Sequence, residues 1–202
     1  MIYAMAGARP ARLAVLAYDI ACPRRAYRVR KVLNPLHHAK QYSVYEAMLG
    51  AGYLRGLLAE LSACCDFSAD RLAVWWPLDG VRLEWQRGRL VVTARAGAPC
   101  REPAALRPNV GNFVVCYDVS DPAALRAVAA AVAAEGAMVQ RSVYWLRLPA
   151  RQLAAVVGRC APHLAADDRL WAYPLGGCGD LWQVGAPPPS ILPIATHRWR
   201  ST

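Results

Sequence analysis

Two aspartates, Asp19 and Asp118, have the residue type and the setting that metal chemistry needs. Each follows directly on an apolar run, 13–18 and 113–117 respectively, that ends in Tyr-Asp. Such a run predicts a buried strand, and a polar residue directly after it emerges at the end of the strand rather than in the core. A single carboxylate binds Mg²⁺ weakly, whereas two that meet form a site of hard oxygen ligands. We therefore consider Asp19 and Asp118 candidate Mg²⁺ ligands.

Helix capping is the alternative role for these carboxylates. It is weak for Asp118, because Asp121 already stands at the N-cap position before a proline. It stays open for Asp19, because the residue before the proline there is Cys22, which caps helices poorly. Capping therefore competes with metal binding for Asp19 only.

Both aspartates belong to a tandem duplication. A Gln-x-Ser-Val-Tyr motif begins 22 residues after each of them, at 41 and at 140. Asp-Arg-Leu then begins at 70 and 168, and Trp-Gln-x-Gly begins at 85 and 182, so the offset between the copies drifts only from 99 to 97. Four matches in the same order indicate two copies of one unit. The duplication supplies the second carboxylate within one chain.

The elements that must position these residues follow from the hydrophobic period. In the first copy we expect strands over 12–20, 40–49 and 70–77, a helix from 23 to 34 and a helix over 54–61. In the second copy we expect strands over 112–119, 138–147 and 168–174, and helices over 122–134 and 149–161. Residues 81–94 indicate a hairpin or a single extension strand, and 180–184 indicate its short counterpart.

This element order is the split β-α-β arrangement with one strand added at the end. We therefore predict an α+β protein of two tandem ferredoxin-like (β-α-β-β-α-β) domains, each an antiparallel sheet covered on one face by two helices. The first domain covers 1–94, a Pro- and Gly-rich linker 95–111, the second domain 112–185 and a C-terminal tail 186–202.

Basic residues gather on the first predicted helix. The chain carries 22 Arg and 2 Lys and has a formal net charge of +10. The basic residues of this helix are Arg24, Arg25, Arg28, Arg30 and Lys31. Arginine suits phosphate groups, so we expect these side chains to contact a nucleic-acid backbone, and an ordinary solvated helix face stays the alternative. The corresponding helix 122–134 carries only Arg126, so the two halves cannot bind phosphates equally.

Other function classes find little support. No window approaches the ~18 apolar residues of a membrane span, and the N-terminus lacks a signal-peptide core, so we expect a cytoplasmic protein with no membrane partner. The seven cysteines form no Cys-x-x-Cys pair and indicate reduced, small apolar residues. Ser43 and Ser142, which we expect in mid-strand, have no histidine in a triad-like relation, and this argues against nucleophilic catalysis.

Taken together, the strand ending in Tyr-Asp-Ile, the helix opened by Pro-Arg-Arg, Gln-Tyr-Ser-Val-Tyr-Glu and Asp-Arg-Leu…Trp-Pro-Leu closely resemble the CRISPR-associated protein Cas2 family. The pattern covers 13–88 and, in weaker form, 112–185. The resemblance implies a ferredoxin-like protomer that works as a two-fold dimer, bridges copies of the Cas1 integrase and holds the duplex DNA that becomes a new spacer in antiviral defence. It also implies a metal-dependent nuclease activity on RNA or DNA in several members, with the strand-end aspartates, Asp19 and Asp118 here, flanking a Mg²⁺ ion at the dimer axis.

The chain departs from that family pattern by being a fused tandem. A linker of about 15 residues can span up to ~50 Å when extended, so we expect the two copies to pair as an intramolecular pseudo-dimer, while further self-association stays open. The second copy carries Arg141 where the first has Tyr42, which suggests that one half has specialised. We expect a CRISPR adaptation protein that binds duplex DNA and bridges integrase subunits. The alternative is a Mg²⁺-dependent endonuclease, a hydrolase with Asp19 and Asp118 as catalytic residues.

Overall fold

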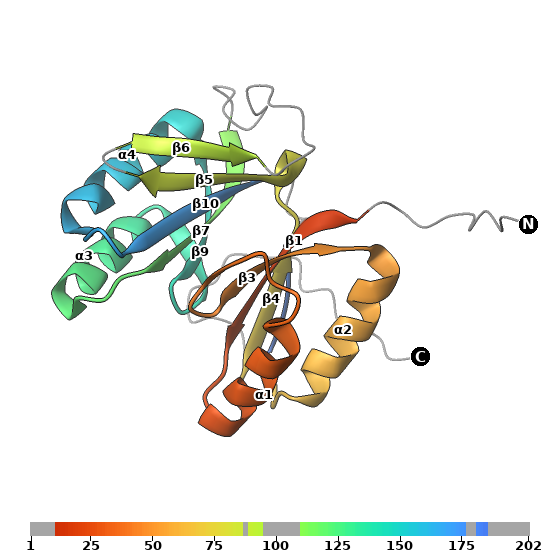
Figure 1. Ribbon diagram of the computed structural model, residues 1–202. Coiled ribbons are helices and arrows are strands. Elements are labelled where there is room, and N and C mark those ends of the chain that lie inside the picture. The colour runs from red at the N-terminus through yellow and green to blue at the C-terminus, as the bar shows by residue number, and fades with distance from the viewer. Residues whose placement is uncertain (1–10, 87–88, 95–109, 177–180, 186–202) are drawn as a thin grey trace, which may run out of the picture.

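The described part of the chain, residues 11–86, 89–94, 110–176 and 181–185 of a computed structural model, is an α+β protein with two antiparallel sheets and four α-helices (Figure 1). The first sheet has the order β11 (Leu181–Gly185), β4 (Arg71–Trp75), β1 (Arg12–Asp19), β3 (Val44–Leu49) and β2 (Ala39–Gln41). The second has the order β6 (Arg89–Ala94), β5 (Val81–Gln86), β10 (Arg169–Leu175), β7 (Val110–Asp118), β9 (Val143–Pro149) and β8 (Gly136–Gln140). The helices are α1 (Pro23–Leu33), α2 (Ala51–Ala63), α3 (Pro122–Ala133) and α4 (Ala150–Cys160).

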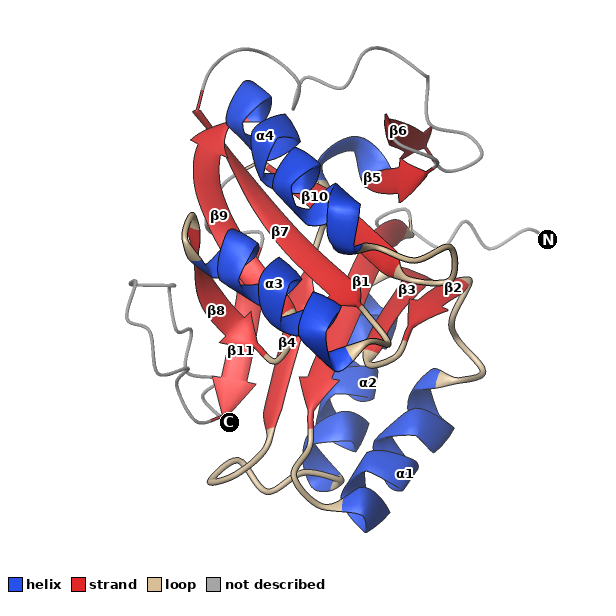
Figure 2. Cartoon of the chain, turned by 90° about the vertical axis from the view of Figure 1, so that its left-hand side faces the viewer, coloured by secondary structure: helices blue, strands red, loops and turns tan. Residues whose placement is uncertain are grey.

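The two sheets face each other, and each carries its helices on its outer face (Figures 1 and 2). Alternation along the strands produces this layering, because successive side chains of a strand point to opposite faces. In β1, Val15 and Ala17 lie in the contact between the sheets, while Leu16 and Tyr18 belong to the core under α1 and α2. Alternate side chains of the apolar run 13–18 therefore pack in two different cores, one between the sheets and one under the helices.

The last strands of each copy lie in the sheet of the other copy. Strand β5 pairs with β10, with Glu84 opposite Trp171, and β6 continues the sheet beyond β5. In return, β11 pairs with β4, with Gln183 opposite Ala73. The sequence copies 1–94 and 112–185 therefore do not coincide with the two sheets, and each sheet contains strands from both.

A buried charged cluster lies where the exchanged strand β5 meets β3 and β10. Glu46 is only 4% exposed, and its Oε1 accepts hydrogen bonds from Tyr173 Oη at 2.9 Å and from Arg82 Nη1 at 2.8 Å. Arg82 Nη2 donates to Glu84 Oε2 at 3.1 Å, and the Arg82 guanidinium carbon lies 4.3 Å from the centre of the Trp171 ring. Glu46 of the first sheet thus finds both of its partners on the second sheet, and they satisfy a charge that would be costly to bury alone.

Two glutamines add hydrogen bonds between the sheets. Gln41 Nε2, at the end of β2, donates to the main-chain oxygen of Arg169 in β10 at 3.2 Å. Gln183 Nε2, in the exchanged strand β11, donates to the main-chain oxygen of Val139 in β8 at the same distance, 3.2 Å. Gln41 opens the first Gln-x-Ser-Val-Tyr motif, so one function of that residue is to join the sheets.

Two segments predicted as single strands are hairpins. The ranges 40–49 and 138–147 each break at a two-residue loop, 42–43 and 141–142, between paired strands. Tyr42 has a φ of 43° and Ser142 a φ of 60°, a left-handed backbone that cannot continue a strand. The expectation that the motif serines lie in mid-strand is therefore wrong.

The helix starts follow local sequence. Asp121 Oδ2 accepts a hydrogen bond from the Ala124 main-chain N–H at 2.7 Å, which confirms the predicted N-cap of α3. Cys22 makes no side-chain cap hydrogen bond before α1, as expected for a poor capping residue.

The predicted linker 95–111 ends two residues too late, because β7 begins at Val110, where it pairs with Pro149 of β9. The rest of that linker, 95–109, and the tail 186–202 lie outside the described residues. Among the described helices, none has the length and apolar character to span a membrane.

Candidate functional site

Asp19 and Asp118 open onto one cavity of about 300 Å³ between the two copies. Asp19 and Asp118 are the last residues of β1 and β7. Because side chains alternate along a strand, Asp19 shares a face with Ala17 and Asp118 with Cys116, and Ala17 and Cys116 lie in the contact between the sheets. The ends of β1 and β7 therefore bring both carboxylates to the rim of that contact.

Equivalent residues of the two copies line most of this cavity, which we call the aspartate cavity. Its polar lining is Asp19, Asp118, Arg30, Gln41, Tyr42, Ser43, Arg141 and Ser142, together with the tyrosines that precede the aspartates. The main-chain oxygens of Ser43 and Ser142 accept hydrogen bonds from the N–H groups of Tyr18 at 3.2 Å and Tyr117 at 3.1 Å. These bonds hold each hairpin loop against the strand that carries the aspartate.

The two aspartates differ in their partners. Arg71 of β4 donates from Nη1 to Asp19 Oδ2 at 3.2 Å. Within the described ranges, no hydrogen bond or ion pair engages the Asp118 carboxylate. Burial raises the pKa of Asp118 above its usual value, the neighbouring charge of Asp168 raises it further, and Arg169 opposes both. Asp118 is thus the carboxylate that a cation would stabilise more.

The donor set fits a Mg²⁺ ion that keeps most of its water. Mg²⁺ commonly binds through one or two carboxylates while several waters complete its octahedron, and Asp19 and Asp118 offer that number. Within the described residues, no cluster of three or more His, Cys, Asp or Glu side chains could hold an ion. An all-protein ligand cage is therefore not what this site provides.

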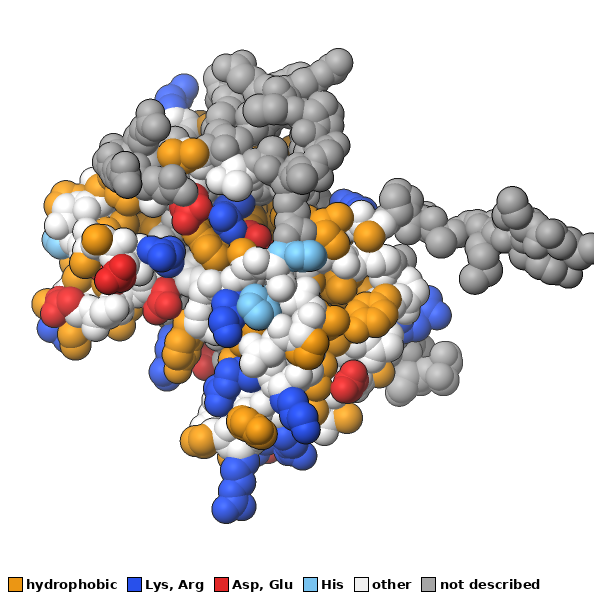
Figure 3. Space-filling view, viewed as in Figure 1, with side chains coloured by type: hydrophobic (Ala, Val, Ile, Leu, Met, Phe, Trp, Pro, Cys, Tyr) orange, Lys and Arg blue, Asp and Glu red, His pale blue; other side chains and the backbone are white. Residues whose placement is uncertain are grey.

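The five predicted phosphate contacts of α1 separate into three groups. Arg24, Arg28 and Lys31 follow one another at helical spacing and are exposed. Figure 3 shows Lys and Arg side chains gathered over the lower part of the molecule, where α1 lies. Arg30 lines the aspartate cavity instead. Arg25 is held by an ion pair, so only the first three form a free basic face, which we call the α1 basic face.

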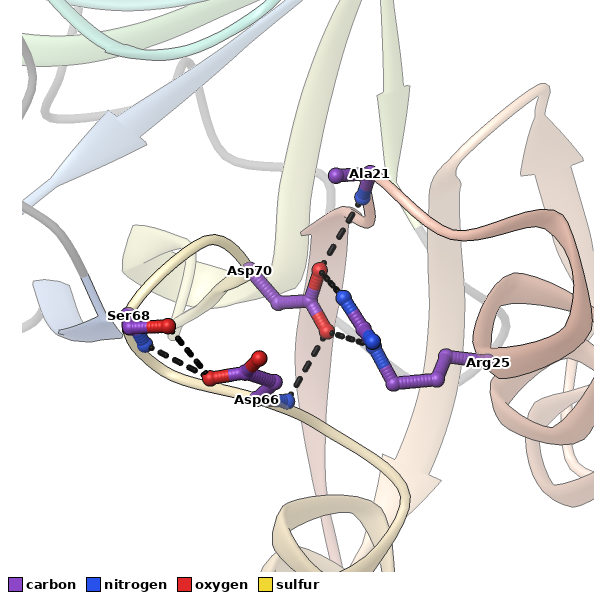
Figure 4. A network of polar contacts seen from close by, with 5 residues as sticks. All are labelled: Ala21, Arg25, Asp66, Ser68 and Asp70. Carbon is purple, nitrogen blue, oxygen red and sulfur yellow. Dashed lines mark hydrogen bonds and ion pairs between the residues drawn. The ribbon is translucent and has the colours of Figure 1, made fainter.

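Arg25 and Asp70 form a network that the sequence did not reveal (Figure 4). Arg25 donates from Nε to Asp70 Oδ2 at 2.6 Å and from Nη2 to Oδ1 at 3.1 Å. The Asp70 side chain is fully buried and also accepts from the main-chain N–H groups of Ala21 at 3.0 Å and Asp66 at 2.9 Å. The network joins the loop before α1 to the loop before β4.

The pKa of Asp70 reports how well this carboxylate is held. Burial would raise that pKa, but the Arg25 guanidinium and the N–H groups of Asp66 and Ala21 outweigh burial and bring it below the usual value. The equivalent Asp168 accepts from Ser120 N at 2.9 Å and Ala165 N at 2.9 Å. Asp70 and Asp168 open the duplicated Asp-Arg-Leu motif. From the sequence, that motif indicated the start of a strand but not these hydrogen bonds.

Known proteins match this chain in two segments. The family model described as "CRISPR associated protein Cas2" matches residues 12–76 and again 112–180. Two relatives from two strains of Thermus thermophilus, "CRISPR-associated endoribonuclease Cas2" and "CRISPR-associated endoribonuclease Cas2 1", are each 36% identical over 75 residues, 37% of this chain and 80% of the relative. A solved structure, "Crystal structure of a hypothetical protein TT1823 from Thermus thermophilus", is 28% identical, covers 35% of this chain and 85% of its own, and has a TM-score of 0.33.

Proposed function

Because the chain belongs to the CRISPR associated protein Cas2 family, we propose that it is a CRISPR adaptation protein that binds duplex DNA and bridges copies of the Cas1 integrase during spacer acquisition. The α1 basic face is the observation that carries this proposal. Arg24, Arg28 and Lys31 stand on one side of the helix at positions i, i+4 and i+7, so one duplex backbone can reach all three.

Binding through this face is sequence-independent and depends on salt. Guanidinium and ammonium groups that neutralise phosphates release condensed counterions, which lowers the affinity as salt rises. The equivalent helix α3 offers only Arg126, so the first copy makes most of the contacts with the DNA backbone. The more neutral second copy is then the side that meets the protein partner.

We further propose that each copy is a ferredoxin-like domain and that the two copies act as a pseudo-dimer within one chain. The strand orders β4-β1-β3-β2 and β10-β7-β9-β8, each with two helices on the outer face, support this assignment. The reciprocal strand exchange supports a permanent pairing, because neither sheet is complete without the other copy. In this arrangement the chain replaces a two-fold dimer.

Fluorescence anisotropy with a labelled DNA duplex in EDTA tests the duplex-binding proposal. The variant Arg24→Gln/Arg28→Gln/Lys31→Gln removes three charges from the α1 basic face. The control Arg55→Gln/Arg126→Gln/Arg151→Gln removes three exposed charges from α2, α3 and α4. We expect the first variant to lower the slope of log affinity against log salt by roughly 3 units, and the control to change it far less.

Equal losses in both triple variants would mean that net charge, rather than the α1 basic face, carries the binding. A wild-type chain that fails to bind duplex at low salt would overturn the proposal. The bridging part needs its own experiment. A Cas1 integrase mixed with this chain should co-elute with it in size-exclusion chromatography, and separate elution would contradict bridging.

A metal-dependent endonuclease of RNA or DNA is the second candidate, favoured by the shared cavity of Asp19 and Asp118. These two residues would hold Mg²⁺, which when bound supplies Lewis-acid chemistry at a phosphodiester. Arg71 keeps the Asp19 carboxylate oriented, and the Asp118 carboxylate, without a hydrogen-bond partner among the described residues, is available to a cation.

Incubation with labelled single-stranded RNA and labelled duplex DNA, each with Mg²⁺ or EDTA, tests the nuclease. Asp19→Ala and Asp118→Ala should both abolish cleavage, while the exposed Asp167→Ala should leave it intact. Cleavage in EDTA, or cleavage that survives Asp118→Ala, would exclude a shared metal site.

A further inference from the structure

The lining of the aspartate cavity departs from the symmetry of the duplication, and two of the departures place arginine side chains there. Residues 42 and 141 are equivalent and both line the cavity, but one is Tyr42 and the other Arg141. A second departure is Arg30, which lines the cavity from α1. The equivalent position in α3 is Ala129, which has no charge. The lining thus presents two guanidinium groups and, besides the paired Tyr18 and Tyr117, the ring of Tyr42, which has no aromatic counterpart in the second copy.

The Tyr42 side chain is largely exposed, as a residue that contacts a ligand would be and a core residue would not. It is 80% exposed, more than any other large apolar side chain of the described residues. Its φ of 43° places a bulky side chain in a backbone region that favours glycine. Within the described ranges, no aromatic contact engages the ring. A tyrosine at such a position, with its ring free of aromatic contacts, offers a face for stacking.

Arg30 and Arg141 supply positive charge to the same cavity. Neither forms an ion pair with a described residue. Of the two carboxylates in the lining, Asp19 is offset by Arg71, so Asp118 is the one carboxylate that stands against these two positive charges. A guanidinium binds phosphate in a bidentate manner, and two of them at one cavity can hold a single phosphodiester. The cavity therefore combines a stacking surface with a phosphate site.

We propose that the aspartate cavity binds one nucleotide of a single-stranded nucleic acid, with its base stacked on Tyr42 and its phosphate held by Arg30 and Arg141. A volume of about 300 Å³ lies within the range of small-ligand sites. A base inside a duplex is already stacked on its neighbours, so Tyr42 discriminates against paired substrates. This site lies apart from the α1 basic face but in the same cavity as the endonuclease candidate, and it rests on the proposed function in taking a nucleic acid as the partner.

Anisotropy in EDTA with labelled oligo(dT), oligo(rU) and a labelled duplex tests the proposal. The central variant is Tyr42→Gly, which removes the ring and also suits the left-handed backbone, so its melting temperature should be at least that of the wild type. We expect it to lose roughly tenfold in affinity for the single strands and less than about twofold for the duplex. Tyr42→Phe, which keeps the ring, should bind single strands almost as the wild type does.

Two controls separate this site from general effects. Tyr53→Ala removes another exposed tyrosine, 55% exposed on α2, and should leave single-strand binding unchanged. Arg141→Gln should lower the salt slope for single strands by roughly 0.7, whereas Arg147→Gln on β9 should not.

Each outcome bears on a different statement. Single-strand affinity that survives Tyr42→Gly, or that falls equally with Tyr53→Ala, overturns the nucleotide site. A wild-type chain that binds duplex but neither oligonucleotide also overturns it and leaves the proposed duplex binding standing. A wild-type chain that binds neither the duplex nor the oligonucleotides contradicts both the nucleotide site and the proposed duplex binding. Comparison of oligo(dT) with oligo(rU) decides whether the sugar is deoxyribose or ribose.

Discussion

Arg71 Nη1 lies 3.2 Å from Asp19 Oδ2, and the matching pair in the second copy forms no such bond. Arg169 faces Asp118 in the same register as Arg71 faces Asp19. Its guanidinium donates instead to the main-chain oxygens of Asp167 at 3.1 Å and Asp168 at 3.3 Å. The duplication has therefore kept the residues at both strand ends but has kept the ion pair at only one of them.

This difference predicts opposite effects of two similar substitutions. Asp19→Asn loses an ion pair that is about a quarter exposed and should destabilise the fold by up to about 1 kcal/mol. Asp118→Asn removes a charge that burial and Asp168 disfavour, so it should raise the melting temperature slightly at neutral pH. Thermal unfolding of the two variants beside the wild type checks both directions.

The pH dependence supplies a control for the second substitution. Because the pKa of Asp118 is raised in the folded state, ionisation of this carboxylate lowers stability as pH rises through the pKa. The advantage of Asp118→Asn should therefore be present at neutral pH and disappear at a pH where the wild-type carboxyl group is protonated. An advantage that is constant across this range would show that the charge is not its cause.

Arg25 is a structural residue despite its place among the basic residues of α1. Arg25→Ala leaves the buried Asp70 carboxylate with main-chain donors alone, and we expect a loss of about 2 kcal/mol in the free energy of unfolding. The neighbouring Arg24→Ala should cost less than about 0.5 kcal/mol, because Arg24 is exposed. Denaturant unfolding of both variants measures the difference, and equal losses would contradict the role of the network.

Acid should weaken the fold through the same carboxylate. The pKa of Asp70 is lowered in the folded state, so its stabilising effect is fully present above the usual pKa of aspartate and is lost as pH falls through the folded-state value. Asp70→Asn should destabilise the chain at neutral pH by about 2 to 4 kcal/mol and reduce the further loss below about pH 4. Urea unfolding from pH 7 to pH 3 tests this, and an unaltered pH slope in the variant would assign the acid sensitivity to other groups.

Cutting the chain between the copies should not separate them. A protease site inserted within 95–109 would leave β5 paired with β10 and β11 paired with β4, with Glu46 bonded to Arg82 and Tyr173 between the sheets. The two fragments should co-elute in native size-exclusion chromatography and part only in denaturant. Separate elution in native buffer would mean that the exchanged strands do not hold the copies together.

Cys22 should react with alkylating reagents before Cys65 does. The main-chain N–H groups of Arg25 and Arg24 lower the pKa of the Cys22 thiol, whereas burial raises the pKa of Cys65 to about 12. At neutral pH a larger share of Cys22 is thiolate, the reactive form. Timed labelling with iodoacetamide and peptide mass spectrometry measures the two rates, and equal rates would contradict the prediction.

Much of the local structure was predictable because its causes are local. The apolar runs before Asp19 and Asp118 predicted buried strands, and Asp121 before a proline predicted the start of α3. The break in the strand at 42–43 escaped prediction, because neither Tyr42 nor Ser43 is a residue type that usually adopts a left-handed backbone.

By itself, the sequence determined the duplication, the family, the order of strands and helices apart from the two hairpins, and the position of both aspartates at strand ends. These properties depend on residue type and spacing along the chain. Only the tertiary structure decided that β5 and β11 each join the sheet of the other copy. It also decided that Arg71 binds Asp19 and that Arg25 binds Asp70, while Arg24 and Arg28 form no ion pair with a described residue. The apolar alternation of an end strand suits the edge of either sheet, and a long arginine side chain can reach several partners, so contacts between distant segments make the choice.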